Sequence, residues 1–122
     1  MTLRRGEADG YAFPVTDEAL AAGVASLREE RTVDLRTQPV AIEVRARGQV
    51  VQDDSRAAHD DPAFQRMLDV YGGLAAQIVT AVEARGELAA ILSVHQLGAP
   101  RRWTADEVDA CRRAATALGG LV

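Results

Sequence analysis

The segment from Ala75 to Val122 constrains the fold of this chain more than any other part of the sequence. It contains two apolar runs of strand length, joined by the short connection Ala84-Arg85-Gly86. A Gly-containing connection of this length between two such runs is typical of a β-hairpin. We therefore expect two adjacent antiparallel strands, with the apolar residues Ile78, Val79, Val82, Leu88, Ile91, Leu92 and Val94.

A capped amphipathic helix is expected after this hairpin. Gly98-Ala99-Pro100 interrupts the second strand, and Thr104 with Glu107 three residues later has the spacing of a capping box. Apolar residues then follow at helical spacing, namely Val108, Cys111, Ala115, Leu118 and Val122. The expected picture is one helix lying on one face of a twisted antiparallel sheet.

Length and composition limit the possible classes of function. A chain of 122 residues with 48% hydrophobic residues is expected to form a single domain spanning residues 1–122. Its longest apolar run is far shorter than the roughly 20 residues of a membrane span, and its first ten residues lack a secretory apolar region. We expect a cytoplasmic protein without a membrane partner. The net charge of −4, with basic residues scattered along the chain, argues against nucleic acid as a partner.

The residue types that the chain lacks exclude several mechanisms. Cys111 is the only cysteine, and the sequence contains neither lysine nor asparagine. Intrachain disulfides, thiolate zinc sites and two-cysteine redox chemistry are therefore excluded. So is a Schiff-base amine. The place of Cys111 on the apolar face of the last helix favours a packing role.

The first third of the chain gives weaker signals. Thr2–Arg5 and Tyr11–Val15 flank an acidic, glycine-containing turn and predict a first hairpin. Leu20, Val24 and Leu27 then have helical spacing, although Gly23 weakens that pattern. A helix is expected here, with a loop covering the fold as the alternative.

The middle of the chain combines an ambiguous stretch with a clear helix. Alternation in the stretch 40–44 predicts a strand, whereas Pro39 suits the first position of a helix. Val50 and Val51 form a firmer strand that ends at Asp53-Asp54. After Asp61-Pro62, four residues at spacing i, i+3, i+4 and i+7 predict a short helix closed by two glycines: Phe64, Met67, Leu68 and Tyr71.

From Pro39 to Val122 the order of these elements resembles a GAF domain. The end of the chain, SVHQLGAPRRWTADEV, is similar to the end of GAF domains of the phytochrome-like branch. The resemblance implies an α+β, profilin-like fold, in which a central antiparallel sheet carries the C-terminal helix on one face and short helices and loops over a pocket on the other. It also implies that Pro39–Arg47 is a helix, and that the usual N-terminal helix is missing.

The candidate site residues come from the last strand and the short helix. With period two, Ser93 and His95 share the face opposite the more apolar Leu92 and Val94, so both are expected to face the pocket. In the phytochrome-like relatives the matching histidine approaches the chromophore. A histidine simply bonded to a backbone carbonyl is the plainer alternative for His95. Further ligand-binding candidates are Tyr71, Gln77 and Phe64, with core packing favoured for Phe64.

Several family activities do not suit this sequence. Covalent bilin attachment needs a thiol near the pocket, and the motif of cyclic-nucleotide-binding GAF domains contains the Asn and Lys that are missing here. Reduction of methionine sulfoxide needs a nucleophilic and a resolving cysteine. His59 with its aspartate neighbours is read as a solvated turn, so no metal site is expected, and a haem is not expected either.

These observations predict a non-enzymatic sensory or regulatory domain. It would bind a small effector of unknown identity and signal by a conformational change, as a homodimer or through a downstream signalling protein. The alternative is a pure dimerisation or protein-interaction module with a filled pocket.

Overall fold

The predicted hairpin forms the centre of the fold. In the computed structural model, which describes residues 1–8 and 10–121, β6 (Leu74–Ala84) pairs antiparallel with β7 (Glu87–Leu97). Arg85 and Gly86 connect the two strands with φ angles of 57° and 78°. Positive φ at both central residues is the requirement of a type I′ turn, whose twist matches that of the strands. The hairpin prediction is confirmed.

Three shorter strands extend this hairpin into a sheet with the order β4-β1-β7-β6-β5. β1 (Thr2–Arg5) pairs with β7, and β4 (Val15–Glu18) pairs with the outer edge of β1. On the other side, β5 (Gln49–Gln52) pairs with β6. All four pairings are antiparallel.

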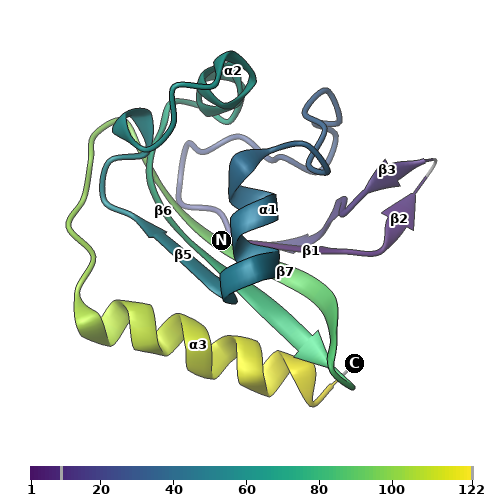
Figure 1. Cartoon of the computed structure of the whole chain (residues 1–122). Helices are drawn as coiled ribbons and strands as arrows, with labels where there is room; N and C mark the ends of the chain where they lie inside the picture. The colour runs from purple at the N-terminus through teal and green to yellow at the C-terminus, as the bar shows by residue number, and fades with distance from the viewer. Residues whose placement is uncertain (9, 122) are drawn as a thin grey trace.

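The predicted first hairpin does form antiparallel strands that begin with Thr2–Arg5, but the residues predicted for its second strand are wrong. The partner of β1 is 15–18 rather than Tyr11–Val15. The residues between form a separate two-stranded ribbon from β2 (Glu7–Ala8) and β3 (Tyr11–Ala12), which projects from the body of the molecule (Figure 1). Phe13, with a φ of 54°, bends the chain between the ribbon and β4.

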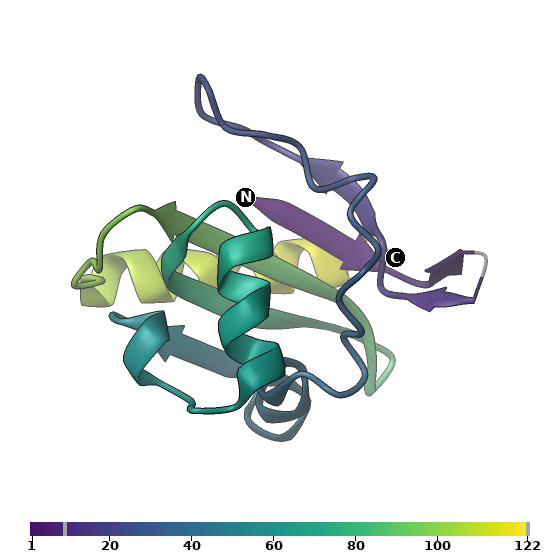
Figure 2. The same ribbon diagram turned by 90° about the horizontal axis from the view of Figure 1, so that it is seen from above.

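The two faces of the sheet carry different layers (Figures 1 and 2). α3 (Ala105–Gly119) lies on one face, beneath β6. The other face carries α1 (Pro39–Arg47), α2 (Pro62–Val70), the 3₁₀ turn η1 (Ser55–Ala57) and the irregular segment 19–38. The expectation of an α+β sheet with the last helix on one face and short helices and loops on the other is confirmed.

The larger hydrophobic core lies on the face of α1 and α2. Its fully buried members include Val44 of α1, Phe64 and Leu68 of α2, and Leu74 of β6. A smaller cluster lies on the α3 face, formed by Val82, Ala90, Leu92 and Ala115. We call the face covered by α1, α2 and the segment 19–38 the thick side of the sheet, and the face covered by α3 the thin side. The thick side has room for a site.

α1 is the helix implied by the family resemblance, and the strand predicted from alternation is wrong. Pro39 occupies the first turn, where its missing N–H costs nothing. Val40 and Val44 are four residues apart and both buried, while Ile42 is 58% exposed. Val40 and Val44 in the alternating pattern are also an i, i+4 pair, which lies on one face of a helix. In the structure this face packs against β5 and β6.

The helix predicted around Leu20, Val24 and Leu27 is absent, and the alternative of a covering loop is correct. The segment 19–38 contains no helix or strand. Gly23 adopts a φ of 80°, which a right-handed helix does not allow. Several bonds fix the path of this segment. The Glu18 carboxylate of β4 accepts from the Leu27 N–H at 3.2 Å, and the Tyr11 hydroxyl of the β2–β3 ribbon donates to the Val33 carbonyl at 2.6 Å.

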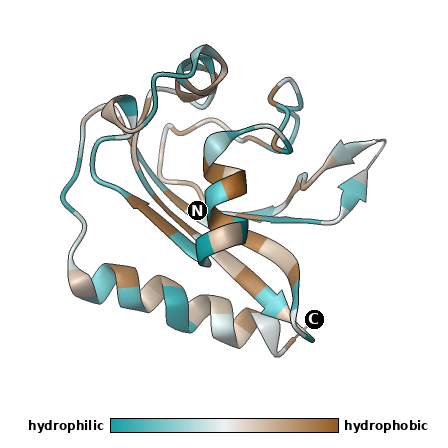
Figure 3. Ribbon diagram, in the orientation of Figure 1, coloured by the Kyte–Doolittle hydropathy of each residue, from teal (hydrophilic) through white to brown (hydrophobic). Residues whose placement is uncertain are grey.

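α3 begins with the predicted capping box. The Thr104 hydroxyl accepts from the Glu107 N–H at 3.1 Å, and the Glu107 carboxylate accepts from the Thr104 N–H at 2.9 Å. Trp103 anchors the junction by donating its ring N–H to the Gln52 carbonyl at 3.0 Å. Apolar and polar residues alternate along α3 (Figure 3). Of its predicted apolar face only Ala115 is fully buried; Val108, Cys111 and Leu118 are half-buried, and Val122 lies outside the described residues.

The C-terminal end of α3 touches β6 so closely that only glycine fits. A Cβ on Gly119 would lie 2.4 Å from the backbone oxygen of Glu83. We expect Gly119→Ala to push the helix end off the sheet and to lower the free energy of unfolding by about 1–3 kcal/mol, although alanine is the better helix former.

Gly120→Ala is the matched control, because its Cβ would meet nothing closer than the Ala117 carbonyl oxygen at 3.5 Å. Urea denaturation of both variants measures the difference. Equal stability of the two variants would show that α3 does not press on β6 as described.

Candidate functional site

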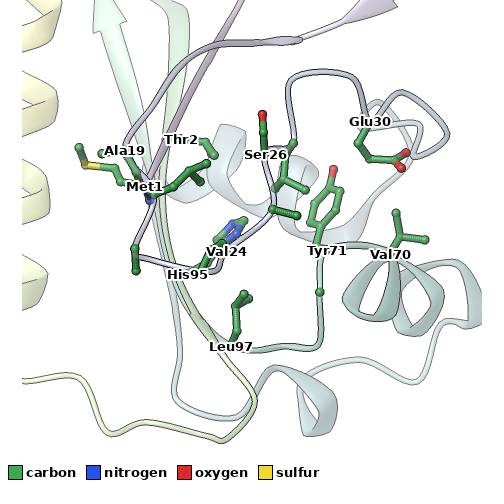
Figure 4. Close-up of a pocket in the computed structure, with 15 residues that line it drawn as sticks. Met1, Thr2, Ala19, Val24, Ser26, Glu30, Val70, Tyr71, His95 and Leu97 are labelled. Atoms are coloured by element: carbon green, nitrogen blue, oxygen red, sulfur yellow. Dashed lines mark hydrogen bonds between the residues drawn. The ribbon is translucent and has the colours of Figure 1, made fainter.

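A cavity of about 410 Å³ opens on the thick side of the sheet. It lies between the end of β7, the C-terminal end of α2 and the covering segment 19–38 (Figure 4). Its walls are mainly apolar and include Leu20, Val24, Leu27, Val70 and Leu97. This outer cavity is also lined by the polar side chains of Thr2, Ser26, Glu30, Tyr71 and His95. A mostly apolar hollow of this size with few polar groups is typical of a small-molecule site.

His95 reaches the outer cavity because of the register of β7. It pairs with Gln77 of β6, and Ser93 pairs with Val79, so these four residues share the thick side of the sheet. Burial, with smaller contributions from the positive charges of Arg4 and the N-terminal amine, lowers the pKa of His95 to about 3. At neutral pH the imidazole is therefore uncharged, with one donor and one acceptor nitrogen.

Tyr71 faces His95 across the cavity. It follows the last turn of α2, and the glycines after it reverse the chain into β6, with φ angles of 84° at Gly72 and 79° at Gly73. The two rings are stacked with centroids 6.1 Å apart and an interplanar angle of 19°. Burial raises the pKa of Tyr71 to about 12, so its hydroxyl stays protonated.

A smaller inner cavity of about 40 Å³ lies behind this aromatic pair. Tyr71 and His95 line both cavities, and the inner one adds four buried polar residues: Arg4, Gln38, Gln77 and Ser93. The Gln77 amide donates to the Gln52 side chain at 2.9 Å. The buried side-chain oxygen of Gln38 has no hydrogen-bond partner among the described residues. Half of the described residues that line the inner cavity are therefore polar.

Four of the five residues predicted to bind a ligand meet at these two cavities. His95 and Tyr71 line both, and Ser93 and Gln77 line the inner one. Phe64 lines neither: it is fully buried in the core, with its ring 5.0 Å from the ring of His59. Its ligand-binding assignment is therefore not supported, because it faces the interior of the α2 layer.

The sequence interpretation missed Arg4, Glu30 and the wall contributed by the segment 19–27. Period two on β1 places Arg4 on the same face as Thr2, and Thr2 pairs with Ser93. The local sequence does not specify this pairing between distant segments, so the sequence carried no signal that pointed to Arg4. The same holds for the segment 19–27, because its path depends on tertiary contacts.

Solved structures share this architecture, whereas a scan of family models and a sequence search of curated proteins found no match. GAF3 from Slr1393 of Synechocystis sp. PCC6803, in its photoproduct state, aligns over 97% of this chain and 77% of its own, with a TM-score of 0.77 and 20% identity. The blue-light absorbing form of the PixJ GAF domain of Thermosynechococcus elongatus covers 98% and 73%, with a TM-score of 0.76 and 21% identity. JSC1_58120g3 with bound biliverdin IXa covers 98% and 76%, with a TM-score of 0.74 and 19% identity.

This chain has the GAF fold. Several of the neighbours are domains of cyanobacteriochromes, as the sequence resemblance to the phytochrome-like branch implied. At these identities the likeness concerns the fold. The function of this chain depends on its own side chains, because a fold hosts many unrelated functions.

The single thiol of the chain is on the wrong side of this GAF fold for covalent attachment in the cavity. Cys111 belongs to α3, which lies on the opposite face of the sheet from the outer cavity (Figure 1). Burial raises the pKa of its thiol, which makes it a poorer nucleophile. The residues present therefore do not suit a covalently bound bilin.

Residues 1–8 and 10–121 are the part of the chain that the structure describes. In these ranges no cluster of three or more His, Cys, Asp or Glu side chains has the arrangement of a metal site. Nor does any helix there have the length and apolar character that crossing a membrane requires. His59 instead bonds to the Glu43 carboxylate at 2.6 Å.

Proposed function

We propose that this protein is a non-enzymatic sensory GAF domain that binds a small effector without a covalent bond. The observation that carries the proposal is the outer cavity of about 410 Å³, lined by the stacked pair Tyr71 and His95. The fold supports it, because the neighbours include photoreceptor domains and one structure with bound biliverdin IXa. Cys111 belongs to α3 on the opposite face of the sheet, which argues against covalent attachment.

Signalling would start from the strand that both layers share. On β7, Ser93 and His95 face the cavities, while Leu92, directly before Ser93, packs on the opposite face in the cluster with Ala115 of α3. A ligand held between His95 and the segment 19–27 would favour one position of β7 and of the loop. That bias would alter the packing of α3, which a partner protein would read.

The covering segment offers a direct test of ligand binding. Val24 lines the outer cavity from this irregular loop, so Val24→Trp is expected to fill the cavity without disturbing the sheet. Thermal shift against a library of small metabolites should find compounds that stabilise the wild-type protein. A compound at 100 times its dissociation constant adds about 2.7 kcal/mol, and Val24→Trp should abolish that gain.

Val51→Trp is the control, because Val51 is 43% exposed on β5 and lies far from the loop in the sequence. It should bind the same compounds as the wild-type protein. If no compound stabilises the wild-type protein, and native mass spectrometry finds only the bare polypeptide, the sensor proposal is wrong.

Dimerisation without a ligand is the second candidate, and an apolar groove on the α3 side favours it. Met1, Leu3, Leu92 and Leu118 line a hollow of about 300 Å³ beside α3. Exposed apolar surface of this kind is common at interfaces. This candidate predicts a homodimer in sedimentation and no compound that stabilises the protein. The cytoplasmic location stays a prediction.

A further inference from the structure

Arg4 is a charged residue inside the sheet. Its side chain is only 4% exposed, on the second strand from the edge, where Arg4 pairs with Ile91 of β7. It shares the thick side of the sheet with Thr2 and lines the inner cavity. Arginine is almost never buried to this extent without an anionic partner.

The contacts of Arg4 within the protein are neutral. One terminal nitrogen donates to the Phe13 carbonyl at 3.1 Å, and the other donates to the Tyr71 hydroxyl at 3.1 Å. The guanidinium also lies 5.5 Å from the centre of the Tyr71 ring. Among residues 1–8 and 10–121, no carboxylate forms an ion pair with Arg4. A guanidinium has five donors, and these hydrogen bonds use two of them.

The nearest candidate for a counterion is engaged elsewhere. Glu30 lines the outer cavity, and its pKa is lowered mainly by the Thr32 hydroxyl and only slightly by Arg4. Its carboxylate accepts from the Thr32 N–H at 2.6 Å. Glu30 therefore belongs to the covering loop, and the positive charge in the inner cavity is left without a direct partner. Such burial is costly unless an anion completes the site.

We infer that the effector carries a carboxylate, which binds to the guanidinium of Arg4 in the inner cavity while its apolar body occupies the outer cavity. This inference rests on the proposed function. The inner cavity of about 40 Å³ has room for about one water molecule or one small head group. Ser93 and Gln77 beside Arg4 supply further polar groups of the kind that orient a head group.

The charge of the site favours a carboxylate over a phosphate ester. A carboxylate has one negative charge and two acceptor oxygens, which suit one guanidinium. A phosphate monoester carries about −1.5 to −2 charges at neutral pH. Of the described residues that line the inner cavity, only Arg4 is cationic, and His95 there is neutral. A second negative charge would be buried without compensation.

A pair of nearly isosteric probes tests the inference on the wild-type protein. 3-Phenylpropionate and 3-phenylpropanamide differ in charge but hardly in size. We expect the acid to bind at least tenfold more tightly than the amide, measured by isothermal titration calorimetry. Equal binding of the two probes, or no binding of the acid, would overturn the inference.

Substitution of Arg4 then shows whether the preference comes from this side chain. Arg4→Gln keeps an amide donor for Phe13 or Tyr71 and removes the charge, and it should eliminate the preference for the acid. Arg5→Gln is the control, because Arg5 is the next residue on β1 and is exposed; it should keep the full preference. A preference that persists in folded Arg4→Gln would also overturn the inference.

The two proposals fail in different ways. If library compounds stabilise the protein and Val24→Trp abolishes their effect, but the acid binds no better than the amide, only the carboxylate inference is wrong. If no compound binds and the two probes have no effect, the sensor function itself is wrong.

Discussion

The free energy of unfolding should fall steeply as the pH drops below about 6.5, because the folded protein resists protonation of His95. Burial lowers the pKa of this imidazole from its usual 6.5 to about 3. In the unfolded chain the imidazole takes up a proton near pH 6.5, whereas in the folded protein it stays neutral until about pH 3. Between these values the unfolded state binds more protons, so stability decreases with decreasing pH.

The expected size of this effect follows from the linkage between proton binding and folding. Each pH unit removes up to about 1.4 kcal/mol, and because His95 is half-buried and borders the outer cavity, the loss by pH 3.5 is at most on the order of 4 kcal/mol. Urea denaturation at several pH values measures it. The interval from pH 6.5 to 5 is the most informative, because most carboxylates titrate below it.

Two histidine variants separate the contribution of His95 from the rest. His95→Gln keeps a polar side chain without a titrating group, and its stability should change little between pH 6.5 and 5. His59→Gln removes the other histidine, which bonds to Glu43, and should keep the wild-type loss. If His95→Gln loses stability as steeply as the wild-type protein, the imidazole is not buried in the way described.

Phe64→Ala is expected to cost about 3–5 kcal/mol of stability, the usual range for removing a buried phenylalanine. Phe64 is fully buried and belongs to the core cluster together with Leu68 and Leu74. Its removal would leave a void that the helix α2 and the strand β6 cannot easily close. The loss should appear in the ligand-free protein, since Phe64 lines neither cavity.

Urea denaturation again gives the measurement, with Ile42→Ala as the control. Ile42 is an apolar residue of α1 that is 58% exposed, so its removal should change stability by no more than about 0.5 kcal/mol. A loss below about 1 kcal/mol in Phe64→Ala, combined with weaker ligand binding, would instead restore Phe64 to the wall of the site.

The strand β7 connects the two sides of the sheet in the proposed signalling mechanism. A strand exposes alternate residues to opposite faces, so Ser93 and His95 meet the cavities while Leu92 meets the α3 side. A ligand that shifts β7 would therefore also change the packing of Leu92 against α3. Cys111, on α3, is separated from the cavity by the sheet.

The sequence by itself determined the parts of the fold whose signals are local. The β6–β7 hairpin follows from two apolar runs and a glycine-containing connection, and α3 follows from the pair Thr104 and Glu107. The face of His95 and Ser93 was also predictable, because side chains on a strand alternate with period two. These features depend on neighbours a few residues apart.

Only the tertiary structure decided the features that depend on distant contacts. The stretch 39–47 satisfies both a strand and a helix pattern, and packing of Val40 and Val44 against the sheet selects the helix. The segment 19–38 has helical spacing, yet it covers the cavity as a loop because Glu18 and Tyr11 fix its path. Arg4 becomes a site residue only when β1 pairs with β7, since local sequence does not specify which residues far apart in the chain will meet.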